Sequence, residues 1–265
     1  DWVLPIGAPP IRDGAVLVKG GLIAAVGPAE ELGATVSHRN RRDYPGCTIV
    51  PGLVNAHTHL VLTCLKGVLP PMPFHEWIRR VPVAYRALTG DDTAASIALG
   101  SLRAIASGTT VVGDIAYGPE SVAIAADLGL AGTFYWEVLG VDTPELAERL
   151  YEIEYPSDPA VGCSTRLHCG LSPHAVYTSG PGALRAVHRI AMAQKVGFAI
   201  HVAESEAERE LLTEGTGPLA ALADLGCLPL AERDLSLGTS RRLALGVGIF
   251  VAAVAVTSFG LLPVQ

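Results

Sequence analysis

Two histidines separated by one residue, His57 and His59, follow a mostly apolar stretch, residues 48–54. In an extended strand, residues two apart point to the same side of the chain, so both imidazoles would face one direction. Neutral imidazole is the most common protein ligand of transition-metal ions. The pair therefore predicts a metal site at the end of a strand.

Further polar residues that could do chemistry stand where later strands are predicted to end: His174, His201 and Glu204. In barrels of alternating strands and helices, catalytic groups lie at the carboxyl ends of the strands. A single buried histidine such as His201 is more often a packed core residue. Its place at the same end as the first pair favours a metal ligand instead.

Glu204 could have either of two roles. By itself it would be an acid near the start of a helix, where the helix dipole stabilises negative charge. Beside a metal ion, a carboxylate can carry a proton from bound water to a leaving group. Three imidazoles together with such an acid form the core of a hydrolytic site.

The elements that would position these residues form two groups along the chain. Residues 1–50 contain two short strands, 14–19 and 22–26, on either side of a Gly-Gly pair, and we expect a small β-sandwich portion there. From residue 48 onward, apolar strands alternate with helices, which is typical of βα units. After the strand that ends at His59, strands are predicted at 109–115, 132–139, 165–171 and 196–202, and helices at 91–107, 119–128, 143–153 and 181–195. These units, about five in number, predict an α/β fold over residues 51–231. The fold would be an incomplete barrel of the (β/α)8 TIM-barrel type.

Three motifs follow one another along the chain. They are residues 51–59 (Pro-Gly-Leu-Val-Asn-Ala-His-Thr-His), 172–177 (Ser-Pro-His-Ala-Val-Tyr) and 200–204 (Ile-His-Val-Ala-Glu). In order and spacing they resemble the amidohydrolase superfamily, and in particular its deaminases and chlorohydrolases that act on cyclic amidines. The resemblance extends over about residues 10–230, and it implies a metal-dependent hydrolase with a (β/α)8 barrel.

The resemblance implies a role for each matching residue. Glu204 would protonate a ring nitrogen of the substrate while metal-activated water attacks the neighbouring carbon and ammonia leaves. His174 would contact the substrate, and Glu76 matches an acid that binds ribose hydroxyls in nucleoside deaminases. As an alternative, Glu76 is a solvated acid at the start of a helix. One divalent ion, zinc first and iron second, would be bound by three ligands: His57, His59 and His201.

A second metal ion would need a bridging, modified lysine at a strand end. The chain has three lysines, Lys19, Lys66 and Lys195, and none of them is predicted at such a position. A site with one metal ion is therefore expected.

The resemblance ends after about residue 231. The superfamily pattern has a further histidine after the sixth strand and an aspartate after the eighth, but no histidine follows His201. The later aspartates, Asp224 and Asp234, are predicted in a helix and a charged turn. Two hypotheses stay open. One is a hydrolase that deaminates an adenine-type nucleoside or a similar cyclic amidine; the other is a catalytically inactive, truncated amidohydrolase-like fragment.

Composition limits the kind of partner. The net charge of −7 argues against nucleic acid, and we expect a small-molecule substrate, either a nucleoside or a heterocyclic amine. Five cysteines without a Cys-x-x-Cys pair, and a start unlike a signal peptide, favour a cytoplasmic protein. Whether the protein forms a homo-oligomer is left open.

Residues 243–264 carry no charge over a length that could span a bilayer. Three glycines and a proline in this segment favour an atypical apolar tail, residues 232–265, over a membrane span.

Overall fold

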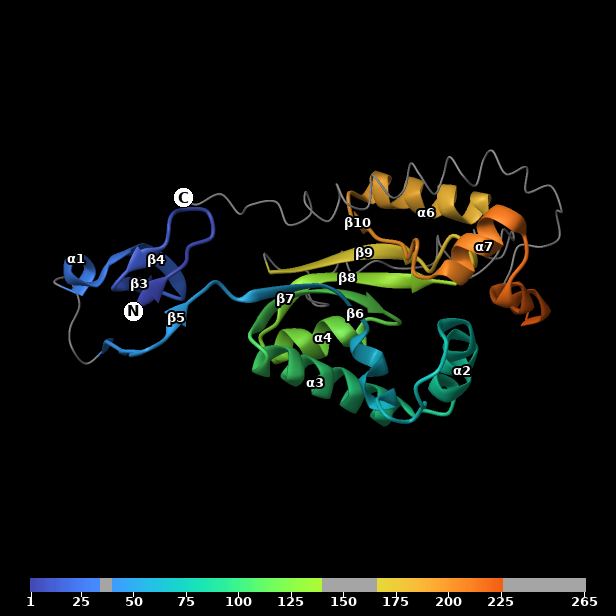
Figure 1. The fold of residues 1–265 in the computed structure, drawn as a ribbon, viewed down its shortest axis with the longest axis horizontal. Coiled ribbons are helices and arrows are strands. Elements are labelled where there is room, and N and C mark those ends of the chain that lie inside the picture. The colour runs from blue at the N-terminus through green and yellow to red at the C-terminus, as the bar shows by residue number, and fades with distance from the viewer. Residues whose placement is uncertain (34–39, 140–165, 226–265) are drawn as a thin grey trace. The chain divides into compact units, whose positions relative to one another are not determined.

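The computed structural model describes residues 1–33, 40–139 and 166–225 (Figure 1). The chain divides into two compact units, Asp1–Leu53 and Val54–Gln265. The predicted domain boundaries, near residues 50 and 231, stay predictions, and the apolar tail from residue 232 lies outside the described residues. None of the helices within these ranges combines the length and the apolar character that crossing a membrane requires.

The first unit is built of short strands. β3 (Gly14–Lys19) and β4 (Leu22–Pro28) form the predicted antiparallel hairpin. Its tight turn needs positive φ at both central residues, and Gly20 and Gly21 have φ angles of 60° and 79°. β1 pairs in antiparallel fashion with β2 and in parallel fashion with β5. The remaining elements of this unit are β1 (Trp2–Val3), β2 (Ile11–Arg12), α1 (Ala29–Gly33) and β5 (Thr48–Ile49).

The second unit contains a five-stranded sheet in the order β10-β9-β8-β7-β6. Its strands are β6 (Leu53–Thr58), β7 (Thr109–Ala116), β8 (Ala131–Val138), β9 (Leu167–Pro173) and β10 (Gly197–Phe198). β7, β8, β9 and β10 pair in parallel with their neighbours. The spatial order follows the chain, so each connection moves the chain one strand along, as in a (β/α) barrel.

Helices connect and cover these strands. α3 and α4 lie beside β7 and β8, and α6 lies beside β9 (Figure 1). The helical segments of this unit are η2 (Leu60–Leu65), α2 (Phe74–Arg86), α3 (Gly90–Ala106), α4 (Glu120–Asp127), α6 (Pro181–Gln194), α7 (Glu206–Glu214) and η4 (Pro218–Leu225). This is the alternation that the sequence predicts for βα units.

Local chemistry sets the start of α3. The Thr89 hydroxyl accepts the backbone N–H of Asp92 at 3.2 Å, and the Asp92 carboxylate accepts the N–H of Thr89 at 2.9 Å. This reciprocal pair satisfies amide groups that have no partner within the helix. The predicted helix at residues 91–107 is therefore confirmed, with a shift of one residue at each end.

The predicted fifth strand, 196–202, is wrong in its length. β10 spans only Gly197–Phe198, and His201 joins the sheet through an isolated bridge to Ala175. The chain still donates from Ala199 to Leu171 and from His201 to His174, but Ala203 has a φ of 60° and ends the extended path. The helix predicted at 143–153 lies outside the described residues.

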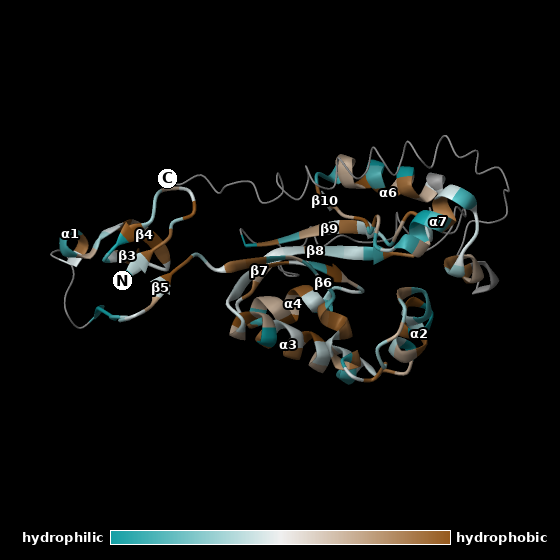
Figure 2. Ribbon diagram, in the orientation of Figure 1, coloured by the Kyte–Doolittle hydropathy of each residue, from teal (hydrophilic) through white to brown (hydrophobic). Residues whose placement is uncertain are grey.

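Two hydrophobic clusters hold the helices onto the sheet. One joins η2, α3 and α4 to β7 and β8, and its buried residues include Leu60, Ile97, Val112 and Phe134. The other lies between β9 and α6, which carries both hydrophobic and hydrophilic residues (Figure 2). β6 also lies very close to β7 at Gly113. A Cβ atom at this position would collide with the carbonyl oxygen of Ala56. Gly113 thereby permits the placement of the strand that ends in the histidine pair.

Candidate metal centre

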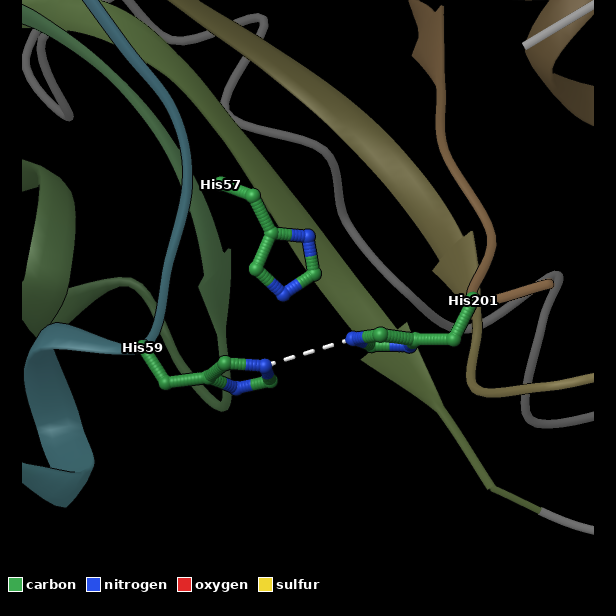
Figure 3. A group of neighbouring side chains, drawn as sticks. All are labelled: His57, His59 and His201. Carbon is green, nitrogen blue, oxygen red and sulfur yellow. Dashed lines mark hydrogen bonds between the residues drawn. The ribbon is translucent and has the colours of Figure 1, made fainter. Parts of the chain in front are cut away.

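Three histidines from opposite edges of the sheet meet at one point (Figure 3). His57 is the second-last residue of β6 and His59 follows that strand, whereas His201 follows β10. One ring nitrogen from each lies within 4.8 Å of the others. In a flat sheet, strands four places apart would be separated by about 19 Å. The meeting of these side chains therefore requires the strand ends to curve around a common axis, as in a barrel.

Hydrogen bonding defines which nitrogen of His201 is free. Its Nδ1 lies 2.6 Å from the carbonyl oxygen of His174. A carbonyl oxygen only accepts, so Nδ1 carries the proton, and Nε2 of the neutral ring offers its lone pair. This Nε2 lies 3.3 Å from Nε2 of His59. A backbone carbonyl behind a ligand imidazole is the usual way in which proteins orient histidines at metal sites.

The electrostatic environment keeps these imidazoles uncharged. Burial, and then the neighbouring rings of His201, His57 and His174, lower the pKa of His59 to about 3. Burial and His201 lower the pKa of His57, and burial lowers the pKa of His201. Neutral imidazole is the form that binds metal ions. Three such nitrogens fit the donor set of a zinc ion, and within the described residues this group contains no carboxylate.

Glu204 lies three residues after His201 in the chain, at the turn into α7. Its Oε2 accepts a hydrogen bond from the Tyr177 hydroxyl at 3.3 Å, and burial raises its pKa. A raised pKa is the direction that favours a carboxyl group as a proton donor. The acid that the sequence predicts for the site is thus held by a tyrosine of the second motif.

His174 faces the same region from the end of β9. It is 9% exposed, and its ring is tilted against that of His201, with 5.3 Å between the ring centroids. Its Nδ1 lies 2.7 Å from the Thr178 hydroxyl. Burial, and then His201, lower its pKa to about 4, so this ring is also neutral.

Glu76 lies outside these groups. It is exposed in the first turn of α2, and Arg80 lies 3.4 Å from its Oε2. Its predicted contact with ribose hydroxyls stays a prediction.

Sequence reasoning missed Glu137, near the carboxyl end of β8. A carboxyl oxygen of Glu137 and one ring nitrogen each of His174 and His201 lie within 4.8 Å of one another. Burial raises its pKa to about 8, against the effect of a hydrogen bond from Tyr117. The signal was present, because an acid ends an otherwise uncharged strand at the level where other strands end in histidine.

Asp114 in β7 was missed as well. Its Oδ1 accepts the backbone N–H of Leu60, the residue after His59, at 2.8 Å. Asp114 is fully buried, and burial raises its pKa to about 7. This bond ties the end of the histidine motif to the neighbouring strand.

Comparison with known proteins agrees with this geometry. The amidohydrolase family model matches residues 48–226, and an imidazolonepropionase-like composite domain of bacteria matches residues 14–35. A 5-methylthioadenosine/S-adenosylhomocysteine deaminase of Syntrophobacter fumaroxidans is 34% identical, over 84% of this chain and 55% of its own length. The corresponding enzyme of Desulforudis audaxviator is 30% identical, over 94% of this chain and 60% of its own length.

Solved structures show the same fold. The aminofutalosine deaminase of Helicobacter pylori in complex with methylthio-coformycin aligns with a TM-score of 0.69 and 20% identity, over 82% of this chain and 53% of its own. A Xanthomonas campestris adenosine deaminase with bound zinc aligns with a TM-score of 0.60 and 26% identity, over 85% of this chain and 54% of its own. The chain spans about half the length of the relatives that it matches.

The predicted barrel class and the resemblance of the three motifs are both confirmed by these matches. The stretch that matches the family model contains the three imidazoles and Glu204. The chain therefore belongs to the amidohydrolase family.

Proposed function

We propose that this chain carries the metal-binding part of a hydrolase that cleaves C–N bonds, deaminating an adenine-type nucleoside or a similar cyclic amidine. The observation that carries the proposal is the convergence of three neutral imidazole nitrogens within 4.8 Å. Glu204, an acid of raised pKa, lies three residues after His201 in the chain. The ligands are His57, His59 and His201; zinc is the first choice of ion and iron the second.

A divalent ion held by these nitrogens would supply Lewis acidity and an activated water molecule. The residues of the chain supply the remaining steps. Glu204 holds a proton on its carboxyl group and delivers it to a ring nitrogen of the substrate, so that the amino group can leave as ammonia. Tyr177 fixes one oxygen of that carboxyl group. His174 contacts the substrate through its free ring nitrogen.

The names of the relatives support a nucleoside substrate. The relatives include 5-methylthioadenosine/S-adenosylhomocysteine deaminases, and the solved neighbours include an aminofutalosine deaminase and an adenosine deaminase. A chlorohydrolase is also among the neighbours. Glu204 favours deamination, because loss of ammonia is assisted by proton delivery.

The cytoplasmic location stays a prediction from the sequence. Formation of a homo-oligomer stays an open alternative.

A second candidate is a fragment that binds metal without turnover. One observation favours it: within the described residues the imidazole group contains no carboxylate. Without a carboxylate at the metal, the attacking water lacks its proton acceptor.

The two candidates are separated by measuring metal content and ammonia release on the same sample. The purified chain is loaded with zinc or iron(II), and ammonia is assayed with adenosine, methylthioadenosine and S-adenosylhomocysteine. One ion per chain with ammonia release supports the hydrolase, and one ion without ammonia supports the fragment. A parallel sample fused to the C-terminal half of the Syntrophobacter relative tests whether turnover needs the rest of the barrel. Loss of the ion in His57→Ala and His201→Ala, but not in the exposed variant His168→Ala, ties binding to the imidazole group.

A further inference from the structure

We infer that Glu137 is a substrate-contacting residue which, together with His174, recognises an N–H or O–H donor on an uncharged nucleoside bound beside the metal centre. This inference rests on the proposed function, because it concerns the ligand of the same site. It assigns a role to an acid that neither the three motifs nor the metal group contains.

The position of Glu137 gives it access to the site. It is the second-last residue of β8 and pairs in register with Ser172 of β9, two residues before His174. One of its carboxyl oxygens lies within 4.8 Å of ring nitrogens of both His174 and His201. Glu137 thus belongs to the same rim of strand ends as the metal ligands.

Glu137, His174 and His201 could themselves hold a metal ion, but His201 cannot serve two groups at once. Its Nδ1 is occupied by the carbonyl oxygen of His174, and only Nε2 is free. That nitrogen lies 3.3 Å from Nε2 of His59. Proteins bind zinc both through three histidines and through two histidines with a glutamate, and the proposed function uses the three-nitrogen group. With His201 engaged there, Glu137 and His174 remain as a pair beside the ion.

In the metal-loaded chain both members of this pair present acceptors, because a nearby dication opposes the effect of burial on the pKa of Glu137 and favours its ionised form. The Thr178 hydroxyl donates to the carbonyl oxygen of Ala175 at 3.3 Å, so it accepts from Nδ1–H of His174 at 2.7 Å. Nε2 of His174 is then unprotonated and can accept a hydrogen bond. The Tyr117 hydroxyl donates to the carboxyl group of Glu137, whereas Oε1 is buried and has no hydrogen-bond partner among the described residues.

The chemistry of the ligand follows from these acceptors. A buried acceptor without a partner is unfavourable, and a ligand that donates an N–H or O–H group removes that penalty. Amino and hydroxyl groups of a nucleoside are such donors. A ligand carboxylate at the same point would face the carboxyl group of Glu137 and the lone pair of His174 Nε2. Anionic groups of a ligand are therefore disfavoured there.

The test measures binding, separately from turnover. The zinc-loaded chain is titrated calorimetrically with adenosine and with methylthioadenosine, in the unchanged form and in Glu137→Gln, Glu137→Leu and Glu214→Gln. Glu214 is exposed at the end of α7 and serves as the matched control. We expect the dissociation constant to rise about tenfold or more in both Glu137 variants, because each loses an acceptor for the ligand, and to stay unchanged in the control. Zinc stoichiometry and affinity should be the same in all four forms, which also shows that the variants are folded.

The outcomes separate this inference from the proposed function. Loss of nucleoside affinity in Glu137→Gln, with zinc binding retained, supports the inference even if no ammonia is released by any form. Unchanged affinity in Glu137→Gln overturns it, even if the chain is an active deaminase. Weaker zinc binding in Glu137→Gln overturns it in favour of a metal ligand. Failure of the unchanged, zinc-loaded chain to bind either nucleoside also overturns it.

Discussion

The backbone N–H of Glu204 donates to Oε2 of Glu208 at 2.7 Å, and the Glu208 side chain is only 1% exposed. The carboxyl group also accepts from the backbone of Ala203, whose φ of 60° is unusual for a residue other than glycine. The first turn of α7 therefore holds a strained segment, and this segment carries the proposed proton donor.

Replacing Glu208 with alanine leaves these amides without their acceptor. We expect the free energy of unfolding to fall by about 1–3 kcal/mol, the usual cost of unsatisfied buried groups. Glu208→Gln keeps one carbonyl acceptor and should recover part of the loss. Urea unfolding followed by circular dichroism measures both, with Glu214→Ala as the exposed control on the same helix. Equal stability of Glu208→Ala and the control would show that the bond contributes nothing.

Asp114 should control metal affinity without touching the ion. Its bond to the amide of Leu60 sets the direction in which the chain leaves His59. We expect Asp114→Ala to weaken zinc binding about tenfold or more, in the range found for residues behind metal ligands. Asp114→Asn keeps an acceptor oxygen and should bind zinc more tightly than Asp114→Ala. Competition with a fluorescent zinc chelator gives the constants, and identical values for both variants would contradict this role.

The three candidate ligands could be singled out in the sequence because short-range rules apply to them. His57 and His59 face one way by strand geometry, and His201 follows a recognisable apolar strand. The strands predicted at 109–115 and 132–139 agree with β7 and β8 to within one residue at each end, since burial makes both strands mostly apolar. What these rules do not contain is the curvature that brings His59 and His201 into contact.

The supporting residues were harder to predict because their partners are not set by local spacing. The segment from Ser205 to Glu208 predicts a reciprocal cap at the start of α7. Ser205 does accept the N–H of Glu208 at 3.2 Å. The Glu208 carboxylate also accepts from Glu204, one residue before the cap, at 2.7 Å, a bond that the capping pattern does not include. Asp114 and Leu60 are far apart in the chain, and only the packing of β7 against η2 joins them.

Acidification should destabilise the metal-free chain through His59. Its pKa is near the ordinary value of 6.5 in the unfolded chain and about 3 in the folded one. Between these values the unfolded state binds more protons, so stability rises with pH across this window and is lost as pH falls. At pH 5 the loss from this residue is on the order of 2 kcal/mol relative to pH 7.

Other groups also change protonation in this pH range. The effect of His59 is therefore measured as a difference in unfolding free energy between the unchanged chain and a variant that lacks this histidine. Glu137 and Asp114, whose pKa values are raised to about 8 and about 7, favour the folded state at acid pH and oppose the trend. The unfolding free energy of the unchanged chain minus that of His59→Asn removes most of their contribution. This difference should become smaller from pH 7 to pH 5, because acid destabilises the unchanged chain more than the variant. A difference independent of pH would mean that His59 is not held neutral in the folded chain.

Removing the metal ion should lower stability in a way that depends on its concentration. An ion that binds only the folded state stabilises it by about 2.7 kcal/mol when its free concentration is 100 times the dissociation constant. Thermal unfolding in buffered zinc should therefore show a Tm that rises with free zinc and falls on addition of chelator. The shift should disappear in the double variant His57→Ala/His201→Ala and persist in His168→Ala, whose exposed side chain lies outside the imidazole group. A zinc-dependent Tm that survives the double variant would move the ion to another part of the chain, because a single remaining imidazole, His59, cannot replace a three-nitrogen site.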